Sequence, residues 1–303
     1  MSELMLIDAA NLYFRAYYAL PESITTPDGR PVNAVRGYLD MSAALIERRR
    51  PRRFVSCLDL DWRPAFRVEL VPSYKAHRVA PNGTEQIPAT LAAQIPLLLD
   101  VLDAIGLVTA GAEGFEADDV IATLATRDVA SVDVVSGDRD LLALATDRVT
   151  VCYTGKGIGK MEPMRAADVQ ARYGVPAEHY ADFAVLRGDP SDGLPGVAGV
   201  GEKTAAALVS RFGPIEAIVA AAERGENGFP AGAAAKVLSS RDYLAIAPAA
   251  VRGRRDVPIG EFDDALYVEP KDADRLEQLA TSLGIATSVA RIQQSIRNSL
   301  ATS

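Results

Sequence analysis

Short apolar runs alternate with longer segments of helical periodicity in the first part of the chain. Five runs rich in Val, Ile, Leu and Phe are typical of short buried strands. They are residues 4–7, 54–58, 107–110, 132–136 and 149–153. Between most of them, apolar residues recur at helical spacing, over residues 35–49, 91–105 and 118–126. This alternation predicts an α/β fold with a mostly parallel central sheet flanked by helices.

The pattern changes near residue 166, where helical segments follow one another with joints marked by glycine and proline. The expected helices cover residues 166–173, 177–187, 203–212, 215–223 and 231–244. A connector over residues 251–268 precedes a final helical segment from Asp272, which is expected to dock on the body. We therefore predict two units, an α/β core over residues 1–170 and a helical region with a C-terminal tail over residues 171–303.

Length and composition indicate a folded protein outside membranes. The chain has 303 residues, of which 49% are hydrophobic and 24% charged, enough to bury a sizeable core. Its first twenty residues lack a basic stretch followed by an apolar run, and no segment approaches the ~18 apolar residues of a membrane helix. Cys57 and Cys152 lie in predicted strands, which suits buried thiols in a reducing compartment. We expect a cytoplasmic location and no membrane partner.

The net charge of −8 argues by itself against nucleic-acid binding, because nucleic-acid-binding proteins are usually basic. A charge tally, however, counts carboxylates that hold metal ions as negative, although the bound cations neutralise them. The positions of the acids therefore matter more than their number.

Acidic residues follow three of the predicted strands. Asp8 ends the first strand, Asp59 follows the second, and Asp138 and Asp140 follow the fourth. Parallel strands present their carboxyl ends at one edge of the sheet, so these side chains are expected to meet there. Further candidates open a helix or lie in a glycine-containing loop of the helical unit: Glu116, Asp118, Asp119, Asp189 and Asp192. Taken alone, these acids also suit a helix N-terminus or a turn.

Several carboxylates at one edge would repel each other, and bound cations relieve that repulsion. Oxygen ligands without nearby His or Cys favour Mg²⁺ or Mn²⁺ over zinc. Two ions roughly 4 Å apart would clamp the attacking and leaving oxygens of a phosphodiester. The acids thus predict phosphoryl chemistry without a covalent protein intermediate.

Two groups of basic residues carry different expectations. Lys75 and Arg78 are spaced to share a helix face, and they lie in a long excursion after Asp59, over the acidic edge, where they could hold the scissile phosphate. The denser run over residues 48–53 immediately precedes a strand, so it should lie at the opposite edge of the sheet. We interpret that run as a charge cluster at a helix C-terminus.

A glycine-rich stretch over residues 193–204 leads into a predicted helix. It matches neither the dinucleotide fingerprint nor the nucleotide-binding loop, and no strand precedes it. Such a loop between two helices lets backbone N–H groups approach a phosphate. It resembles a helix–hairpin–helix clamp on the DNA backbone, although a plain turn between helices is the simpler alternative. The candidate DNA-binding residues are Gly196, Gly199, Gly201, Lys203 and Thr204.

Five motifs together resemble the 5′ nuclease (flap endonuclease) family, in particular the 5′-to-3′ exonuclease domain of bacterial DNA polymerase I and its stand-alone relatives. They are Leu6–Asp8, Tyr74–Arg78, Phe115–Val120, Ser136–Leu141 and Gly188–Val197. The resemblance implies a resolvase/PIN-like core, a helical arch above the site and a helix–three-turn–helix DNA-binding unit. It also implies two or three Mg²⁺ or Mn²⁺ ions, with a potassium ion at the helix–three-turn–helix loop.

Residue by residue, the nine acids named above fall on the family's metal-binding carboxylates. Lys75 and Arg78 match its arch-base cations, and Arg15 matches an arginine near the phosphate. Asp59 is the least secure match, because its spacing to Phe66 is one residue longer than usual and Asp61 competes with it. We prefer Asp59 because it ends the strand.

The resemblance implies a metal-dependent enzyme that cuts DNA with a 5′ flap or 5′ single-stranded end, leaving 5′-phosphate and 3′-hydroxyl products in replication and repair. We expect a monomer, with functional coupling to a DNA polymerase as a further implication. Two alternatives remain, a PIN-like metal-dependent ribonuclease and a non-catalytic module that binds branched DNA. The clamp-like loop argues against the first, and the full set of acids argues against the second.

Overall fold

A computed structural model describes residues 3–301 of the chain. Its centre is a six-stranded sheet in the order β3-β2-β1-β4-β5-β6. The strands are β1 (Leu4–Asp8), β2 (Arg53–Cys57), β3 (Val108–Ala110), β4 (Val132–Ser136), β5 (Val149–Tyr153) and β6 (Glu162–Met164). The first five strands pair in parallel, as predicted, while β6 pairs antiparallel with β5. The sequence pattern missed β6 because it has only three residues and contains Pro163, which is tolerated in an edge strand.

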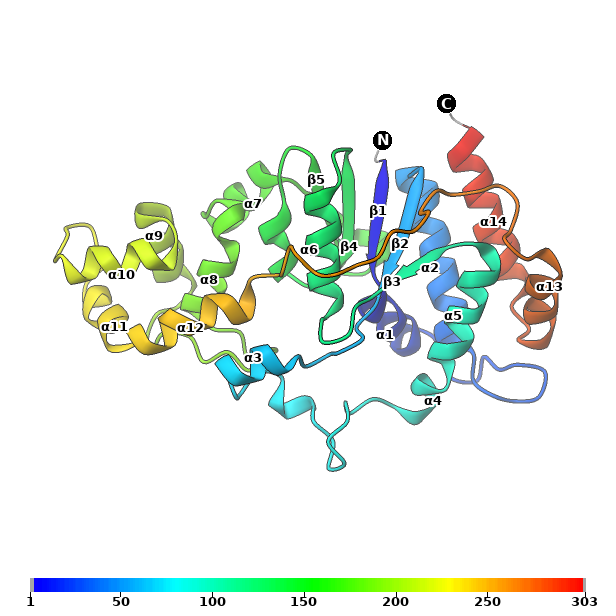
Figure 1. Cartoon of the computed structure of the whole chain (residues 1–303), viewed down its shortest axis with the longest axis horizontal. Helices are drawn as coiled ribbons and strands as arrows, with labels where there is room; N and C mark the ends of the chain where they lie inside the picture. Colours follow the sequence, from blue (N-terminus) through cyan, green and yellow to red (C-terminus); the bar gives the residue numbers. More distant parts are fainter. Residues whose placement is uncertain (1–2, 302–303) are drawn as a thin grey trace.

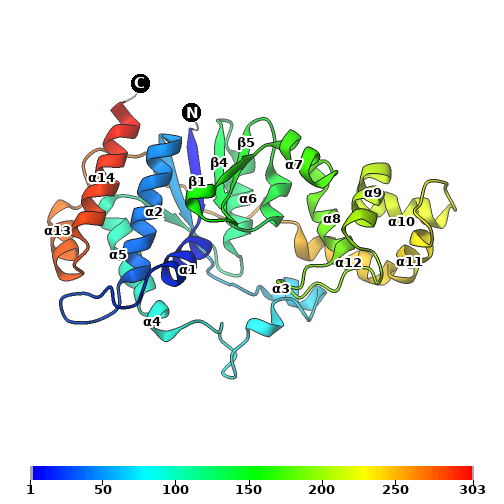
Figure 2. The ribbon, with the colours of Figure 1, turned by 180° about the vertical axis from the view of Figure 1, so that it is seen from behind.

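Two helical layers cover the sheet, as Figures 1 and 2 show from opposite sides. On β1, Leu4 and Leu6 pack in a core cluster with α6 (Ala117–Arg127), which continues into the helical unit. Met5 and Ile7 point the other way and pack with residues of α2 (Asn33–Arg49) and α5 (Gln94–Ile105). Alternate residues of the strand thus serve opposite faces, which explains why the strand is apolar throughout.

The remaining helices follow the predicted pattern with a few differences. They are α1 (Ala9–Ala19), α3 (Ala65–Leu70), α4 (Ala89–Ala92), α7 (Ala166–Tyr173), α8 (Tyr180–Arg187), α9 (Glu202–Phe212), α10 (Ile215–Glu223), α11 (Ala233–Ser239), α12 (Arg241–Val251), α13 (Ala273–Ser282) and α14 (Ala286–Ala301). Short 3₁₀ turns are η1 (Ala76–Arg78), η2 (Asp140–Leu144), η3 (Ile158–Lys160) and η4 (Ala177–His179). The sequence pattern did not predict α1 or α3. It predicted α4 and α5 as one helix, and α11 and part of α12 as another.

Helices α8 to α12 lie together at one end of the molecule (Figure 1), and their buried residues continue the core cluster of β1 and α6. The last two helices, α13 and α14, return to the core instead, where α14 lies along α2 and α13 lies against α5 (Figure 2). Buried Val289, Ile292 and Ile296 join the same core cluster as Met5 and Ile7. The predicted C-terminal tail therefore completes one face of the α/β core.

The arginine run lies at the edge of the sheet opposite the acids, where its members form ion pairs. Arg49 donates two hydrogen bonds to Asp133, of 2.6 and 2.8 Å. Arg53 forms a similar pair with Asp264, with distances of 2.7 and 2.8 Å. The first pair connects the end of α2 to β4, and the second connects the start of β2 to the connector before α13, which gives the run a structural role.

No single helix within residues 3–301 is long and apolar enough to cross a membrane. Helices α9 and α10, which are bent by 84° relative to each other, satisfy the criteria of length and composition only as a pair.

Candidate functional site

The carboxyl ends of β1, β2 and β4 open into a pocket of about 600 Å³, which we call the acid pocket. Five of the nine predicted carboxylates line it, together with all three predicted phosphate-binding cations. The acids are Asp8, Asp59, Glu116, Asp118 and Asp138, and the cations are Arg15, Lys75 and Arg78. Residues from five separate parts of the chain thus meet at one edge of the sheet.

Asp8 links the sheet to the first helix. One side-chain oxygen accepts the backbone N–H of Asn11 at 3.0 Å and so caps α1, and the other accepts the Ser136 hydroxyl at 2.6 Å. Burial, and next the negative charge of Asp59, raise the pKa of Asp8 to about 7. The two hydrogen bonds fix the orientation of the Asp8 side chain and partly oppose this rise in its pKa.

The structure separates the two candidates after β2. Asp59 accepts the backbone N–H of Ala117 at 2.6 Å, at the start of α6, and lines the acid pocket. Asp61 accepts the backbone N–H of Arg63 at 3.1 Å in a local turn and is not among the pocket residues. The geometry favours Asp59.

The three acids at the start of α6 have different surroundings. Glu116 is buried, accepts the Tyr74 hydroxyl at 2.7 Å, and contacts both Arg67 and Lys75. Burial raises its pKa to about 7, although Lys75 and Arg67 oppose the shift. Asp118 faces the pocket, and burial together with the charges of Asp138 and Asp8 raises its pKa well above the ordinary value.

Asp119 is fully buried and both of its oxygens are engaged by other groups. They accept hydrogen bonds from Arg67 at 2.7 and 3.0 Å, and one also accepts the backbone N–H of Arg254 at 2.8 Å. It does not line the acid pocket.

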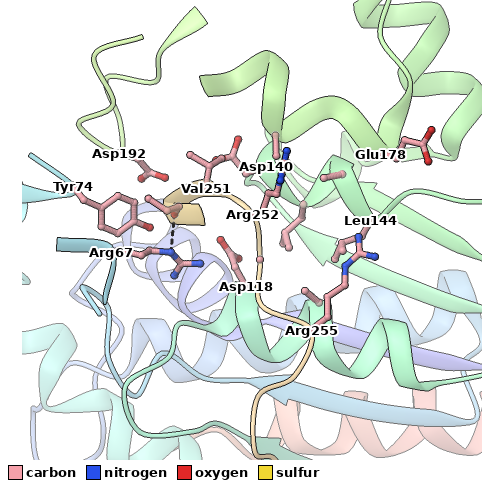
Figure 3. A pocket seen from close by; sticks show the side chains of 16 residues that line it. Arg67, Tyr74, Asp118, Asp140, Leu144, Glu178, Asp192, Val251, Arg252 and Arg255 are labelled. Carbon is pink, nitrogen blue, oxygen red and sulfur yellow. Dashed lines mark hydrogen bonds between the residues drawn. The ribbon is translucent and has the colours of Figure 1, made fainter. Parts of the chain in front are cut away.

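A second cavity of about 270 Å³, the inner cavity, lies beside the acid pocket and shares Asp118 with it. Asp140 and Asp192 also line it, as Figure 3 shows. One oxygen of Asp140 is buried and has no hydrogen-bond partner among residues 3–301. Burial, followed by the charge of Asp138, raises its pKa well above the ordinary value. Within residues 3–301, Oδ1 of Asp140 is thus a buried acceptor with no donor.

Asp189 and Asp192 lie in the loop between α8 and α9. Asp189 accepts the backbone N–H of Ser191 at 2.9 Å and contacts Arg187 at 3.3 Å. Asp192 pairs with Arg78 at 3.2 Å, and burial raises its pKa. This loop is bound to the core, because the backbone oxygen of Asp192 accepts the backbone N–H of Lys75 at 2.9 Å.

Lys75 and Arg78 lie over the acids, but not on a shared α-helical face as expected. Lys75 has a left-handed backbone (φ 46°), and residues 76–78 form the single 3₁₀ turn η1. The Lys75 ammonium contacts Glu116, while Arg78 donates to the Ser191 carbonyl at 2.7 Å. Arg15 approaches from α1, and its buried Nε has no hydrogen-bond partner in the described part of the chain.

Residues 58–93, which we call the arch segment, are mostly irregular, although the family resemblance implied a helical arch above the site. It contains the short helices α3 and α4, the turn η1 and a bridge between Val79 and Glu85. Four prolines are spread along it, at positions 64, 72, 81 and 88, and proline interrupts helices. In Figure 1 the segment crosses below the sheet from α3 to α4.

The acids do not form a preformed metal site. Within residues 3–301, no three His, Cys, Asp or Glu side chains are grouped closely enough to hold an ion. Lys75 and Arg67 stand against Glu116, and Arg78 stands against Asp192. The donors nevertheless fit a hard divalent cation, because they are all oxygens, several have raised pKa values, and Asp140 has an unused buried oxygen.

Two functional candidates were missed in the sequence. Arg67 is only 2% exposed, and nothing in its local pattern distinguishes it from a solvated arginine on a short helix. Lys236 of α11 donates to the Gly199 carbonyl at 2.8 Å, so it lies beside the glycine-rich loop although 37 residues separate the two positions.

The glycine-rich loop joins α8 to α9 as a helix–hairpin–helix would. Gly196 and Gly199 have left-handed backbones (φ 70° and 73°). A side chain on Gly196 would meet the Gly188 nitrogen at 2.6 Å, so this glycine serves close packing inside the loop. Gly199, Gly201 and Lys203 are exposed at the start of α9, whereas Thr204 is partly buried. An exposed helix N-terminus with a lysine suits phosphate binding.

Comparison with known proteins agrees with this arrangement. Residues 3–174 match the family model of the 5′-3′ exonuclease N-terminal resolvase-like domain, and residues 175–274 match that of the 5′-3′ exonuclease C-terminal SAM fold. The chain belongs to the 5′-3′ exonuclease family. The predicted fold class, a resolvase-like α/β core with a helical second unit, is confirmed.

The chain is similar to the 5′-3′ exonuclease of Mycobacterium tuberculosis, with 48% identity over 97% of this chain and 98% of the relative. It is also 39% identical to DNA polymerase I of the same organism over 92% of this chain, which spans only 30% of the polymerase. The prediction that the chain is a nuclease is confirmed.

Among solved structures, the fold is similar to bacteriophage T5 flap endonuclease crystallised with DNA and metal ions. The TM-score is 0.62, with 18% identity, 99% of this chain covered and 100% of the phage chain covered. At this identity the similarity supports the fold.

Proposed function

We propose that this 5′-3′ exonuclease family member hydrolyses DNA phosphodiesters at 5′ flaps and 5′ single-stranded ends with Mg²⁺ or Mn²⁺, in replication and repair. The main support is the acid pocket, where five carboxylates meet the side chains of Arg15, Lys75 and Arg78. The products would carry 5′-phosphate and 3′-hydroxyl ends. Both M. tuberculosis relatives bear names consistent with this role.

Eight carboxylates would hold the ions. Those of the acid pocket are Asp8, Asp59, Glu116, Asp118 and Asp138, and those toward the helical unit are Asp140, Asp189 and Asp192. We leave out Asp119 because Arg67 and two backbone N–H groups already occupy its oxygens. When bound, divalent ions supply an activated water and neutralise charge on the leaving oxygen. Either two or three ions are consistent with this number of oxygens.

The cations of the arch segment would bind the scissile phosphate. Lys75 now contacts Glu116 and Arg78 contacts Asp192, so each positive charge is held beside the acids until a phosphate arrives. Arg15 approaches from α1, its buried Nε has no hydrogen-bond partner among the described residues, and it would bind the same phosphate or its neighbour. Together they would offset the negative charge of the phosphodiester and align it for in-line attack.

The duplex on one side of the flap would lie against the start of α9. Backbone N–H groups near Gly199 and Gly201, with Lys203 and Thr204, would contact its phosphates. Lys236 already donates to the Gly199 carbonyl and adds a second positive charge beside the loop. A potassium ion at this loop stays a prediction.

Cleavage of a labelled 5′-flap duplex, with single-stranded RNA as the competing substrate, tests the proposal. We expect flap release with Mg²⁺ or Mn²⁺ and none in EDTA. Survival of the flap in the presence of metal while the RNA is cut would favour a ribonuclease. Binding of the flap without cleavage of either substrate would favour a non-catalytic module.

Asp138→Asn is the matched variant for this experiment. Asp138 accepts the backbone N–H of Asp140 at 2.8 Å, a bond that an asparagine oxygen can also accept. The substitution therefore removes charge with little change in shape. We expect cleavage to fall by about 100-fold or more, by analogy with other single electrostatic groups of active sites, while flap binding stays within twofold. Comparable turnover in the variant would contradict the role of Asp138.

A further inference from the structure

Arg67 is buried where three parts of the molecule meet. It lies on α3 in the arch segment and is 2% exposed. Its Nε donates to the backbone oxygen of Ala250, in α12, at 2.9 Å. Its two terminal nitrogens donate to Asp119 of α6 at 3.0 and 2.7 Å, and one of them also contacts Glu116. The guanidinium thus connects the arch segment, the acid-bearing helix and the helical unit.

Aromatic rings fix the guanidinium in place. Its central carbon lies 5.1 Å from the centre of the Phe66 ring and 5.7 Å from that of Tyr74. Figure 3 shows Arg67 and Tyr74 side by side at the inner cavity, with Asp118 nearby. An arginine packed between rings and bonded in a fork has little freedom to turn. Its carboxylate partners are therefore held in defined orientations.

The two oxygens of Glu116 have different partners. Arg67 and Tyr74 hold Oε2, and both of these side chains are buried. Lys75 contacts Oε1, and this lysine lines the acid pocket. Only the Oε1 side of the carboxylate therefore faces a group that substrate or metal could displace. The Oε2 side is set by the arginine.

Asp119 is the partner that keeps Arg67 in position. It accepts a hydrogen bond from each terminal nitrogen, and it lines neither the acid pocket nor the inner cavity. Its remaining contacts are the backbone N–H groups of Arg254, at 2.8 Å, and of Glu116, at 3.3 Å. Every bond it makes is to a protein donor.

We propose that Arg67 is a positioning residue of the nuclease site. Anchored by Asp119, it works with Tyr74 to hold Oε2 of Glu116 and so keeps Oε1 turned toward the acid pocket. Its hydrogen bond to the Ala250 carbonyl connects α3 of the arch segment to the end of α12. Arg67 therefore holds the arch segment and the helical unit in a defined relative position. The inference rests on the proposed function, because it treats Glu116 as a metal ligand.

The test uses the full-length protein with Arg67→Lys, Asp119→Asn and the double variant. Arg67→Lys keeps the charge but loses the fork, and Asp119→Asn keeps the shape but loses the anchoring charge. Arg36→Lys, at an exposed ion pair, is the matched control. Circular dichroism and thermal unfolding confirm folding, and Mn²⁺ binding is measured by electron paramagnetic resonance without any substrate. Cleavage of the 5′-flap duplex then gives kcat and KM.

We expect both single variants to weaken Mn²⁺ binding about tenfold and to lower kcat about tenfold, with KM and flap binding in EDTA within twofold of the unaltered protein. Because Asp119 acts through Arg67, the double variant should be no worse than the poorer single variant. Additive losses would show that Asp119 acts independently of Arg67. A lower Tm with unchanged Mn²⁺ binding and kcat would reduce Arg67 to a structural ion pair.

Flap cleavage tests the proposed function, whereas Mn²⁺ binding tests the role of Arg67, so the two can fail independently. If the unaltered protein binds Mn²⁺ but does not cut the flap, the proposed function fails, while the Mn²⁺ measurements still decide the role of Arg67. If Arg67→Lys does not fold, Asp119→Asn carries the test alone. Unchanged Mn²⁺ affinity in a folded Asp119→Asn protein would then overturn the proposal.

Discussion

Burial and repulsion between neighbouring acids make the ionised form of individual carboxylates in the acid pocket unfavourable. The pKa values of Asp8 and Glu116 are raised to about 7, above the ordinary values near 4. Groups raised in this way stabilise the folded protein at low pH, where they are protonated. That contribution is lost as the pH rises through about 7, because the folded state must then hold the charges apart.

Metal binding should therefore stabilise the protein more at high pH than at low pH. We expect Mn²⁺ to raise Tm at pH 8 by about 3 °C or more beyond its effect at pH 5.5, where protons compete for the same oxygens. Differential scanning fluorimetry with Mn²⁺ or EDTA measures the difference. Asp8→Asn should reduce it. An equal Mn²⁺ effect at both pH values would show that these carboxylates are not the binding groups.

The acids could be anticipated at the residue scale, whereas their partners could not. Asp8 and Asp138 follow apolar strands, so the sheet alone brings them together. Arg67 gives no such signal, because an arginine beside an aromatic residue is ordinary on an exposed helix and its burial depends on Asp119 and Ala250, far away in sequence. Lys236 was missed for the same reason.

Individual elements meet at the loop between α8 and α9, which is packed against the arch segment with no space between the two backbones. Gly193 has a left-handed backbone (φ 72°), and a side chain there would lie 2.1 Å from the Ser73 oxygen. Ser73 also donates its hydroxyl to the Gly193 carbonyl at 2.7 Å. This contact sets the distance between Asp192 in the loop and Lys75 in the arch segment.

Gly193→Ala should therefore separate the loop from the arch segment. We expect a loss of about 1–3 kcal/mol in unfolding free energy from backbone strain and reduced flap cleavage, since Asp192 would shift. Gly260→Ala is the control, because a side chain at Gly260 meets nothing within 4 Å. Urea unfolding and flap cleavage measure the two effects. A Gly193→Ala protein as stable and active as the control would contradict the role of this contact.

Helix α9 is the element predicted to bind the duplex. Lys203→Ala should weaken duplex binding and reduce the slope of its logarithm against salt by about one. Lys271→Ala is the control, since Lys271 pairs with Asp103 beside α13. Fluorescence anisotropy over a salt series gives both slopes. Identical slopes for the two variants would exclude a phosphate contact at Lys203.

The observed element boundaries match the predicted ones where the hydrophobic periodicity is strong. They differ where prolines or a helix-capping residue alter the backbone. Runs rich in β-branched residues, such as β4 and β5, lie where they were expected. The arch segment was expected to be helical from family resemblance, yet its prolines limit it to short turns. Helix α1 was missed because its apolar residues continue directly from β1, with Asp8 both ending the strand and capping the helix.

Across the whole molecule, part of the buried core lies far from the residues proposed for catalysis. The tail helix α14 packs against α2, and Ile292 is fully buried there, away from both cavities. Ile292→Ala should lower the unfolding free energy by about 2–5 kcal/mol through the cavity it leaves, with kcat at 25 °C unchanged in the folded protein. Chemical denaturation and flap cleavage measure both. A fall in kcat without a fall in stability would mean that the tail acts on the site.

The beginning of β1 and the end of α14 lie close together at the sheet edge opposite the acids. The backbone oxygen of Glu3 accepts the N–H of Arg52, and the Ser299 hydroxyl donates to the neighbouring Pro51 carbonyl at 2.7 Å. A fluorescent dye, an affinity tag or a second protein joined near either position would emerge behind the sheet. Such an attachment would leave the entrance to the acid pocket clear, which allows a surface-tethered form of the protein to be studied on DNA one molecule at a time.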